Sequence, residues 1–319
     1  MGSGNRLKLG LFGANCSSGR AVTMVPERWS GGWKDCARLA QMADRAGIEF
    51  MLPIGRWKGY GGETDYQGAT FETVTWACGL LAKTERLVVF GTVHAPLIAP
   101  LIAAKEFVTA DHIGEGRFGL NLVCGWNEGE FEMFGATLRD HEARYAYAQE
   151  WLDVVKLAWS AREDFDFAGQ YLKLKGGRAK PKPYAGTRPL IMNAGASSTG
   201  QSFAIRNCDA LFSNVSRGIS FEETVQHVAN VKALARQCGR EIDVYARNLA
   251  DTNESDLRTP SPIELHDTSK SSGSASTLFT FWPYLLLASL LLFFIEWFIN
   301  PRMSSSNLRR ASGHAVSIR

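Results

Sequence analysis

Residues 87–124 read LVVFGTVHAPLIAPLIAAKEFVTADHIGEGRFGLNLVC, and they carry the clearest indication of the fold class. Leu87–Val93 and Phe118–Cys124 are short apolar runs, typical of strands that are buried on both faces. Between them, Ala99–Ile113 has helical spacing and stops at Gly114. A strand, a helix and a second strand in this order predict two parallel strands joined by a helix.

Strands and helices alternate in the same way on both sides of this segment, from residue 6 to about 246. The expected strands are Leu7–Phe12, Glu49–Ile54, Leu87–Val93, Phe118–Cys124, Pro189–Asn193 and Ala210–Val215, with a stub of a seventh at Glu241–Ala246. The expected helices are Lys34–Ala46, Phe71–Lys83, Ala99–Ile113, His141–Trp159, Ser202–Arg206 and Glu222–Gln237. On this pattern alone, a doubly wound sheet and a TIM (β/α)8-type barrel both remain open.

The composition excludes several classes of function. The chain has 319 residues and a net charge of +3, with scattered charges, so no nucleic-acid partner is expected. Six cysteines lie far apart and form no Cys-x-x-Cys pair, which argues against a metal site and against a disulfide framework. The N-terminal MGSGNRLKLGLFGAN lacks the apolar stretch of a secretory signal, so we expect residues 1–246 to stay in the cytoplasm.

The character of the chain changes near residue 247. Arg247–Ser276 is polar and rich in Ser, Asp and Thr, which predicts a disordered linker. Thr277–Asn300 holds roughly 18 residues without a charge, which as a helix would span about 27 Å of a bilayer core about 30 Å thick. We therefore expect one C-terminal transmembrane helix at residues 277–300, followed by a basic tail at 301–319.

In a parallel α/β barrel, binding and catalytic groups collect at the carboxyl ends of the strands. The strand Glu49–Ile54 leads into PIGRWKGYGG (Pro53–Gly62), whose glycines let backbone approach a ligand closely. Within this loop, Gly55, Arg56 and Trp57 offer open backbone, a charge and a flat ring. The loop is therefore a candidate part of a ligand site.

The third and fourth expected strands contribute further polar and aromatic residues to this candidate site. His94 follows the third expected strand, Asn121 lies inside Phe118–Cys124, and Trp126 and Glu130 come just beyond it. Three of them also have a purely structural interpretation: Asn121 could be a hydrogen-bonded core amide, His94 a core or capping histidine, and Trp126 a packing residue.

Two further features lie in the next part of the chain. Arg144 and Tyr145 open the helix His141–Trp159, where they could also be ordinary helix surface. The loop AGASSTG (Ala194–Gly200) precedes a helix, and Ser197 could bind phosphate there or serve only as a helix cap. No Ser-His-Asp order, Walker loop or G-x-G-x-x-G after a first strand is present, so hydrolase, P-loop and Rossmann interpretations lack support.

Taken in order, three segments carry a family resemblance: GRFGLNLVCGW (Gly116–Trp126), EFEMFG (Glu130–Gly135) and HEARYAYAQEW (His141–Trp151). GRWKGYGG (Gly55–Gly62), FGTVHAPLIAP (Phe90–Pro100), KPKPY (Lys180–Tyr184) and the AGASSTG loop agree with the same pattern. With these segments the chain resembles the bacterial luciferase-like FMN-dependent monooxygenases. The most similar group within that family comprises the pyrimidine, dimethylsulfone and alkanesulfonate monooxygenases.

The resemblance implies a TIM barrel that uses reduced FMN, supplied by a separate NAD(P)H:flavin reductase, together with O2. One oxygen atom would be transferred to a small organic substrate that contains sulfur or nitrogen. Carried over position by position, the FMN contacts would be Gly55, Arg56, Asn121, Glu130, Arg144, Tyr145 and Ser197. His94, Trp126 and Trp57 would line the substrate side of the flavin ring as the catalytic set. The flavin would carry the chemistry, while the protein would provide position and exclude water.

The resemblance stops near Ala246, before the last one or two strands of such a barrel. The C-terminal part instead resembles the anchor of an unrelated single-span membrane protein, and a natural fusion, a frameshift and an assembly join all remain open. Two other functions also stay open: a non-catalytic membrane-tethered remnant and a deazaflavin-dependent oxidoreductase. We expect a barrel on the cytoplasmic side of a membrane, tethered through residues 277–300, and a homo-oligomer is possible for this barrel type.

Overall fold

The computed structural model describes residues 8–178, 180–213 and 220–246, and its central feature is a parallel sheet. Seven strands form this sheet in the described ranges, and their order in space follows the chain, β1-β2-β3-β4-β7-β8-β9. The strands are β1 (Gly10–Phe12), β2 (Phe50–Leu52), β3 (Val88–His94), β4 (Phe118–Val123), β7 (Leu190–Asn193), β8 (Ala210–Ser213) and β9 (Asp243–Ala246). Every neighbouring pair is parallel, which confirms the α/β prediction.

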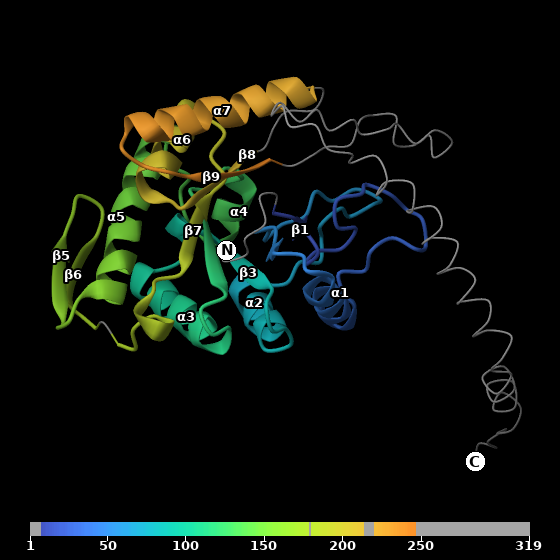
Figure 1. The fold of residues 1–319 in the computed structure, drawn as a ribbon, viewed down its shortest axis with the longest axis horizontal. Coiled ribbons are helices and arrows are strands. Elements are labelled where there is room, and N and C mark those ends of the chain that lie inside the picture. The colour runs from blue at the N-terminus through green and yellow to red at the C-terminus, as the bar shows by residue number, and fades with distance from the viewer. Residues whose placement is uncertain (1–7, 179, 214–219, 247–319) are drawn as a thin grey trace, which may run out of the picture. The chain divides into compact units, whose positions relative to one another are not determined.

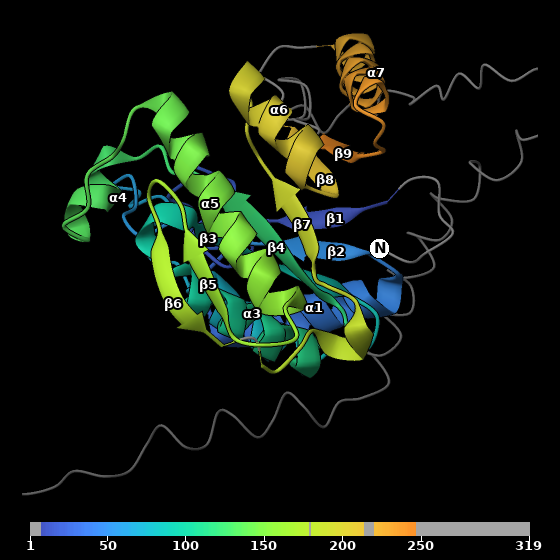
Figure 2. The ribbon, with the colours of Figure 1, turned by 90° about the vertical axis from the view of Figure 1, so that its left-hand side faces the viewer.

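Six helices follow the strands and cover one face of the sheet (Figures 1 and 2). They are α1 (Trp33–Ala46), α2 (Thr73–Leu81), α3 (Pro100–Ile113), α5 (His141–Ser160), α6 (Ser198–Asn207) and α7 (Phe221–Gln237). A doubly wound sheet would reverse its strand order once and carry helices on both faces. The order here runs in one direction only, so the doubly wound alternative does not apply to the described chain.

Apolar side chains fill the other face of the sheet, which is curled around them. The rings of Phe12 and Phe212 lie 5.1 Å apart, centroid to centroid, although they stand on β1 and β8. The rings of Phe50 and Tyr245, from β2 and β9, are 5.0 Å apart. Such contacts between distant strands require strong curvature, as in a barrel. In the described ranges the sheet is nevertheless open, because β1 pairs with β2 alone and β9 with β8 alone.

Two elements were not expected from the sequence: the hairpin of β5 (Phe165–Ala168) and β6 (Lys173–Gly177), and the short helix α4 (Glu128–Met133). The hairpin forms a separate antiparallel sheet beside α5. Its turn is held by the carboxylate of Glu150, which accepts the backbone N–H groups of three consecutive residues, Gln170–Leu172, at 2.7–3.0 Å. This clamp adds to the apolar contacts of the hairpin, in which Phe165 and Leu172 pack against the core.

Helix α6 begins at Ser198, four residues before the predicted start at Ser202. The side chain of Ser197 accepts the N–H of Gly200 at 3.1 Å and so caps the first turn. The first turn is polar, so the sequence pattern did not indicate the helix start, because helical periodicity can be recognised only where apolar residues recur.

The predicted linker, membrane helix and basic tail at 247–276, 277–300 and 301–319 lie outside the described residues. Within the ranges that the structure describes, no helix is both long enough and apolar enough to cross a membrane.

Candidate active site

A pocket of about 650 Å³ opens where the parallel strands end at their carboxyl side. Its wall is formed by the loops after β1, β2, β4 and β7 and by the start of α5. Seven of the residues singled out in the sequence line it: Gly55, Arg56, Asn121, Trp126, Arg144, Tyr145 and Ser197. The remaining three, Trp57, His94 and Glu130, are not part of its lining.

Asn121 places an unpaired acceptor at this pocket. The hydroxyl of Thr92 donates to the Pro53 carbonyl at 2.7 Å and in turn accepts the Asn121 side-chain NH2 at 3.1 Å. This relay fixes the orientation of the Asn121 amide. Its Oδ1 has no hydrogen-bond partner among the described residues, although Asn121 is only 4% exposed. An unpaired buried acceptor is costly, so this atom suits a ligand that donates an N–H.

The start of α6 forms another part of the pocket wall. The first turn of a helix leaves backbone N–H groups without intrahelical partners, and their partial positive charge favours anions. Ser197 lies at this helix start, and its Oγ is 3.0 Å from Nε2 of His141 on α5. A side chain at Gly200 would come within 2.5 Å of the Tyr145 hydroxyl, so glycine lets this turn close around the ring. Burial raises the pKa of Tyr145, which keeps its hydroxyl protonated as a donor.

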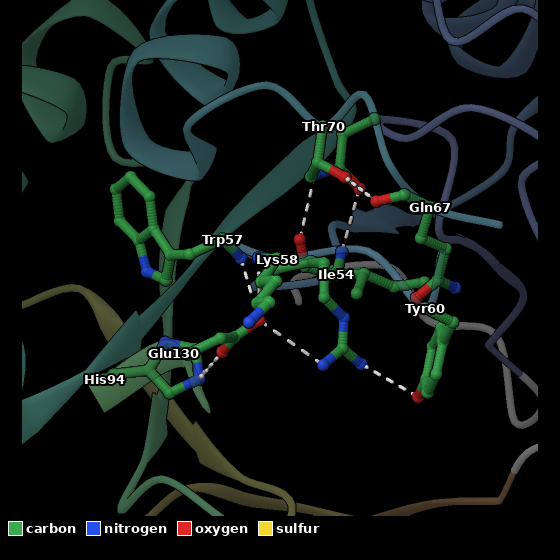
Figure 3. A network of polar contacts seen from close by, with 10 residues as sticks. Ile54, Trp57, Lys58, Tyr60, Gln67, Thr70, His94 and Glu130 are labelled. Atoms are coloured by element: carbon green, nitrogen blue, oxygen red, sulfur yellow. Dashed lines mark hydrogen bonds and ion pairs between the residues drawn. The ribbon is translucent and has the colours of Figure 1, made fainter. Parts of the chain in front are cut away.

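The loop after β2 is fixed from behind by Glu130 of α4 (Figure 3). The Oε1 atom of Glu130 accepts the backbone N–H groups of Trp57 at 2.9 Å and Lys58 at 3.2 Å, and it lies 3.4 Å from the Arg56 guanidinium. Glu130 is 1% exposed. Its position behind the loop indicates that it acts by holding Arg56 and its neighbours in place.

The Arg56 guanidinium borders the pocket between two aromatic rings. It lies 4.8 Å from the ring centre of Tyr60 and 5.1 Å from that of Trp126, both within the range of cation–π attraction. Its Nε has no partner in the described chain. Arg144 fixes the loop that carries Trp126, because its guanidinium donates to the Gly125 carbonyl at 2.5 Å.

His94 and Trp57 lie behind the pocket wall. Burial lowers the pKa of His94 to about 4, although the Glu130 carboxylate at 3.9 Å acts in the opposite direction. His94 is therefore neutral at pH 7. The Trp57 ring is 45% exposed and packs edge-on against Phe134 at 5.0 Å. Of the three residues expected on the substrate side, only Trp126 borders the pocket.

The pocket residues that were not identified from the sequence include Arg20, Gln67 and His141. Arg20 and Gln67 stand in polar loops that carry no motif, so only the fold brings them to the site. His141 had a usable signal, because it opens the same helix as Arg144 and Tyr145, one turn earlier.

Comparison with known proteins gives consistent similarities. Residues 7–256 match the family model described as luciferase-like monooxygenase. The chain is 31% identical over 255 residues to the FMNH(2)-dependent dimethylsulfone monooxygenase of Pseudomonas putida, covering 79% of this chain and 68% of that protein. It is 27% identical over 253 residues to pyrimidine monooxygenase RutA of Acinetobacter baylyi, covering 78% and 68%.

A similar solved structure is riboflavin lyase with modified FMN and the substrate riboflavin. The TM-score is 0.67 at 23% identity, which shows likeness of fold. The match covers 76% of this chain and 62% of that one, so the chain spans less than two thirds of the length of this structural relative.

Proposed function

Because the chain belongs to the luciferase-like monooxygenase family, we propose that its pocket binds reduced FMN and that O2 is used there to oxygenate a small organic substrate. The observation that carries the proposal is the unpaired acceptor of Asn121 in a pocket that also includes the start of α6. We further propose that the curled sheet is part of a (β/α)8-type barrel, which its one-directional strand order supports.

The pocket residues fit FMN. The isoalloxazine ring carries an N–H that matches the Asn121 Oδ1 acceptor. The phosphate matches Ser197 and the α6 N-terminus, with the protonated hydroxyl of Tyr145 beside them. Arg56, Arg144 and Gly55 also line the pocket, and we assign them to the flavin as well. The volume of about 650 Å³ lies within the usual range for small-molecule sites.

Reduced FMN, when bound, supplies the electrons that activate O2. The chain's own residues bind and orient the flavin and the substrate and shield them from water. Phe12, Leu52 and Phe212 give the pocket apolar walls that limit access of water. Glu130 holds the loop of Arg56 in place, and neutral His94 adds no charge behind it. A separate flavin reductase would supply the reduced FMN, and the substrate class given by the family is a sulfur- or nitrogen-containing molecule.

The test is isotope transfer by the full chain. The chain would be supplied with FMN, NAD(P)H, a flavin reductase and 18O2, with uracil or dimethyl sulfone as probes. We expect one labelled oxygen per product, dependent on reduced FMN and lost in Asn121→Leu. A folded chain that fails to bind FMN would contradict the proposal. Reduction of a deazaflavin by substrate without oxygen uptake would favour the alternative oxidoreductase.

A further inference from the structure

A row of polar side chains joins the starts of helices α5 and α6, at the end of the pocket that the proposed function gives to the flavin phosphate. His141 is the first residue of α5, and its Nε2 lies 3.0 Å from the Oγ of Ser197, which caps α6. The Nδ1 of His141 lies 3.2 Å from Oε1 of Glu142. The hydroxyl of Thr199 donates to the same carboxylate oxygen at 2.8 Å. His141 and Ser197 both line the pocket.

Glu142 determines which ring nitrogen of His141 carries the hydrogen. Hydrogen bonds from Thr199 and His141 lower the pKa of Glu142, so its carboxylate is ionised at pH 7 and can only accept. Nδ1 of His141 is therefore the donor toward Glu142. In a neutral imidazole the other nitrogen, Nε2, carries no hydrogen and must accept. On that side the donor is the hydroxyl of Ser197.

With His141 neutral, the hydroxyl of Ser197 has no hydrogen left for a phosphate. A hydroxyl has one O–H donor and two acceptor lone pairs. The donor is directed at His141, and one lone pair accepts the N–H of Gly200 at 3.1 Å. Ser197 also hydrogen-bonds the side chain of Tyr145. The oxygen therefore has all its hydrogen bonds within the protein.

A proton on His141 reverses its hydrogen bond with Ser197. The charged ring has hydrogens on both nitrogens, so Nε2 donates to Ser197 while Nδ1 still donates to Glu142. Ser197 then accepts from His141 and Gly200, and the hydroxyls of Ser197 and Tyr145 are free to donate to a phosphate. The change takes one proton from solvent, turns these O–H groups and breaks no other covalent bond.

The charges around His141 are otherwise balanced. The titratable side chains within about one turn of it on α5 are Asp140, Glu142, Arg144 and Tyr145. The first turn of α6, Ser198–Gln201, has no charged side chain. The pocket wall adds the cations Arg20 and Arg56 and the neutral thiol of Cys124, and among the described residues no Asp or Glu lines it. A phosphate monoester, with a charge of about −2 above pH 7, would bring the strongest negative charge to His141.

We propose that His141 takes up a proton when FMN binds, and that this proton turns the Ser197 hydroxyl from His141 toward the flavin phosphate. The inference rests on the proposed function and adds a pH-linked step to it, in which His141 is a positioning residue for Ser197. Because the complex holds a proton that the free chain lacks, FMN affinity should fall as the pH rises from 7 to 9. The phosphate does not contribute in this range, since its second pKa is about 6.

The experiment titrates oxidised FMN into the full chain by calorimetry at pH 7.5, in buffers of different ionisation enthalpy. The dependence of the binding enthalpy on that of the buffer gives the number of protons taken up. We expect about 0.3–0.8 proton per FMN and about a 3- to 10-fold loss of affinity between pH 7 and pH 9. Riboflavin, which has no phosphate, should bind without proton uptake.

Two histidine variants complete the test. His141→Gln should still bind FMN, with no proton uptake and with the same affinity at pH 7 and pH 9. His112→Gln is the matched control, because the His112 ring contacts the Lys182 carbonyl at 2.8 Å and does not line the pocket. Its proton uptake should equal that of the wild type.

Four results would overturn the proposal: equal FMN binding enthalpies in all buffers, uptake that persists in His141→Gln, the same uptake with riboflavin, or an FMN affinity of the wild type that does not change between pH 7 and pH 9. If His141 only fixes Ser197 in place, His141→Gln would weaken FMN by the same factor at both pH values, and this too would overturn it. A folded chain that does not bind FMN would instead contradict the proposed function itself.

Discussion

Glu130 gives the sharpest test of how the pocket is built, because one carboxylate oxygen accepts three donors in a buried place. Replacing Glu130 by Ala leaves the N–H groups of Trp57 and Lys58 without their partner and frees the Arg56 guanidinium. Glu130→Gln keeps an oxygen at the same position and removes the charge. The two variants therefore separate loss of the hydrogen bonds from loss of the charge.

The size of the effect follows from the number of donors. A buried N–H left unpaired costs about 1–3 kcal/mol, so two of them cost about 2–6 kcal/mol if they stay buried. The loop can open and let water in, which lowers the expected loss of unfolding free energy to about 2–4 kcal/mol for Glu130→Ala. Glu130→Gln should lose about 1 kcal/mol, because its oxygen still accepts although without a charge.

The assay combines urea unfolding with FMN titration. We expect the dissociation constant for FMN to rise about 10- to 100-fold in Glu130→Ala, since Gly55 and Arg56 lose their fixed position. Glu128→Ala, on the exposed side of the same helix, serves as the control. An unfolding midpoint and an FMN affinity that both equal those of the wild type in Glu130→Ala would refute the reasoning.

Three further predictions address the phosphate end, pH and the C-terminal segment. Ser197→Asp should weaken FMN binding about 10-fold or more, because it places a negative charge beside the phosphate, while Trp126→Ala should mainly lower turnover. If both variants have equal and negligible effects on FMN affinity and on NAD(P)H-coupled oxygen consumption, the assignment is wrong. Burial raises the pKa of Asp44, but three backbone N–H donors outweigh it and hold this pKa below its ordinary value. The ionised Asp44 carboxylate therefore stabilises the fold fully above the ordinary pKa of about 3.9, and this stabilisation is lost as the pH falls through the pKa of the folded state. In urea unfolding, Asp44→Asn should lower the free energy of unfolding by about 1 kcal/mol at pH 7 and by less below about pH 4. A loss that stays the same at both pH values would contradict this. If Phe279–Ile299 spans a membrane, the full chain should resist alkaline extraction, and protease should cleave residues 1–246 only after permeabilisation. Full-length protein in a detergent-free soluble fraction would contradict the span.

The sequence predicts the parallel sheet well because its strands are buried on both faces. Leu87–Val93 and Phe118–Cys124 stand out as continuous apolar runs, and the helix between them ends at a glycine. The hairpin at Phe165–Gly177 escapes the same reasoning. Its strands are partly exposed and carry Asp, Lys and Gly, and a carboxylate from α5 holds its turn.

The site is predictable only in part, for a related reason. Asn121 is a polar residue inside the apolar strand β4, and Ser197 stands at the start of α6, so both can be picked out from the chain order alone. Glu130 looks like a ligand contact in the sequence, but its direction toward a loop more than 70 residues earlier depends on tertiary packing. Gln67 lies in a polar loop without a motif, so its place in the pocket wall depends on the fold.

The most direct test of the central claim compares FMN with riboflavin, which has the same ring system and no phosphate. When FMN is titrated into the full chain, its fluorescence should be quenched with a dissociation constant in the micromolar range. Riboflavin should bind at least about 10-fold more weakly, because the start of α6 and Ser197 then meet no anion. In Asn121→Leu the binding of both flavins should weaken to the same extent. Absence of quenching by a folded chain at high micromolar FMN, or equal affinity for FMN and riboflavin, would contradict the account.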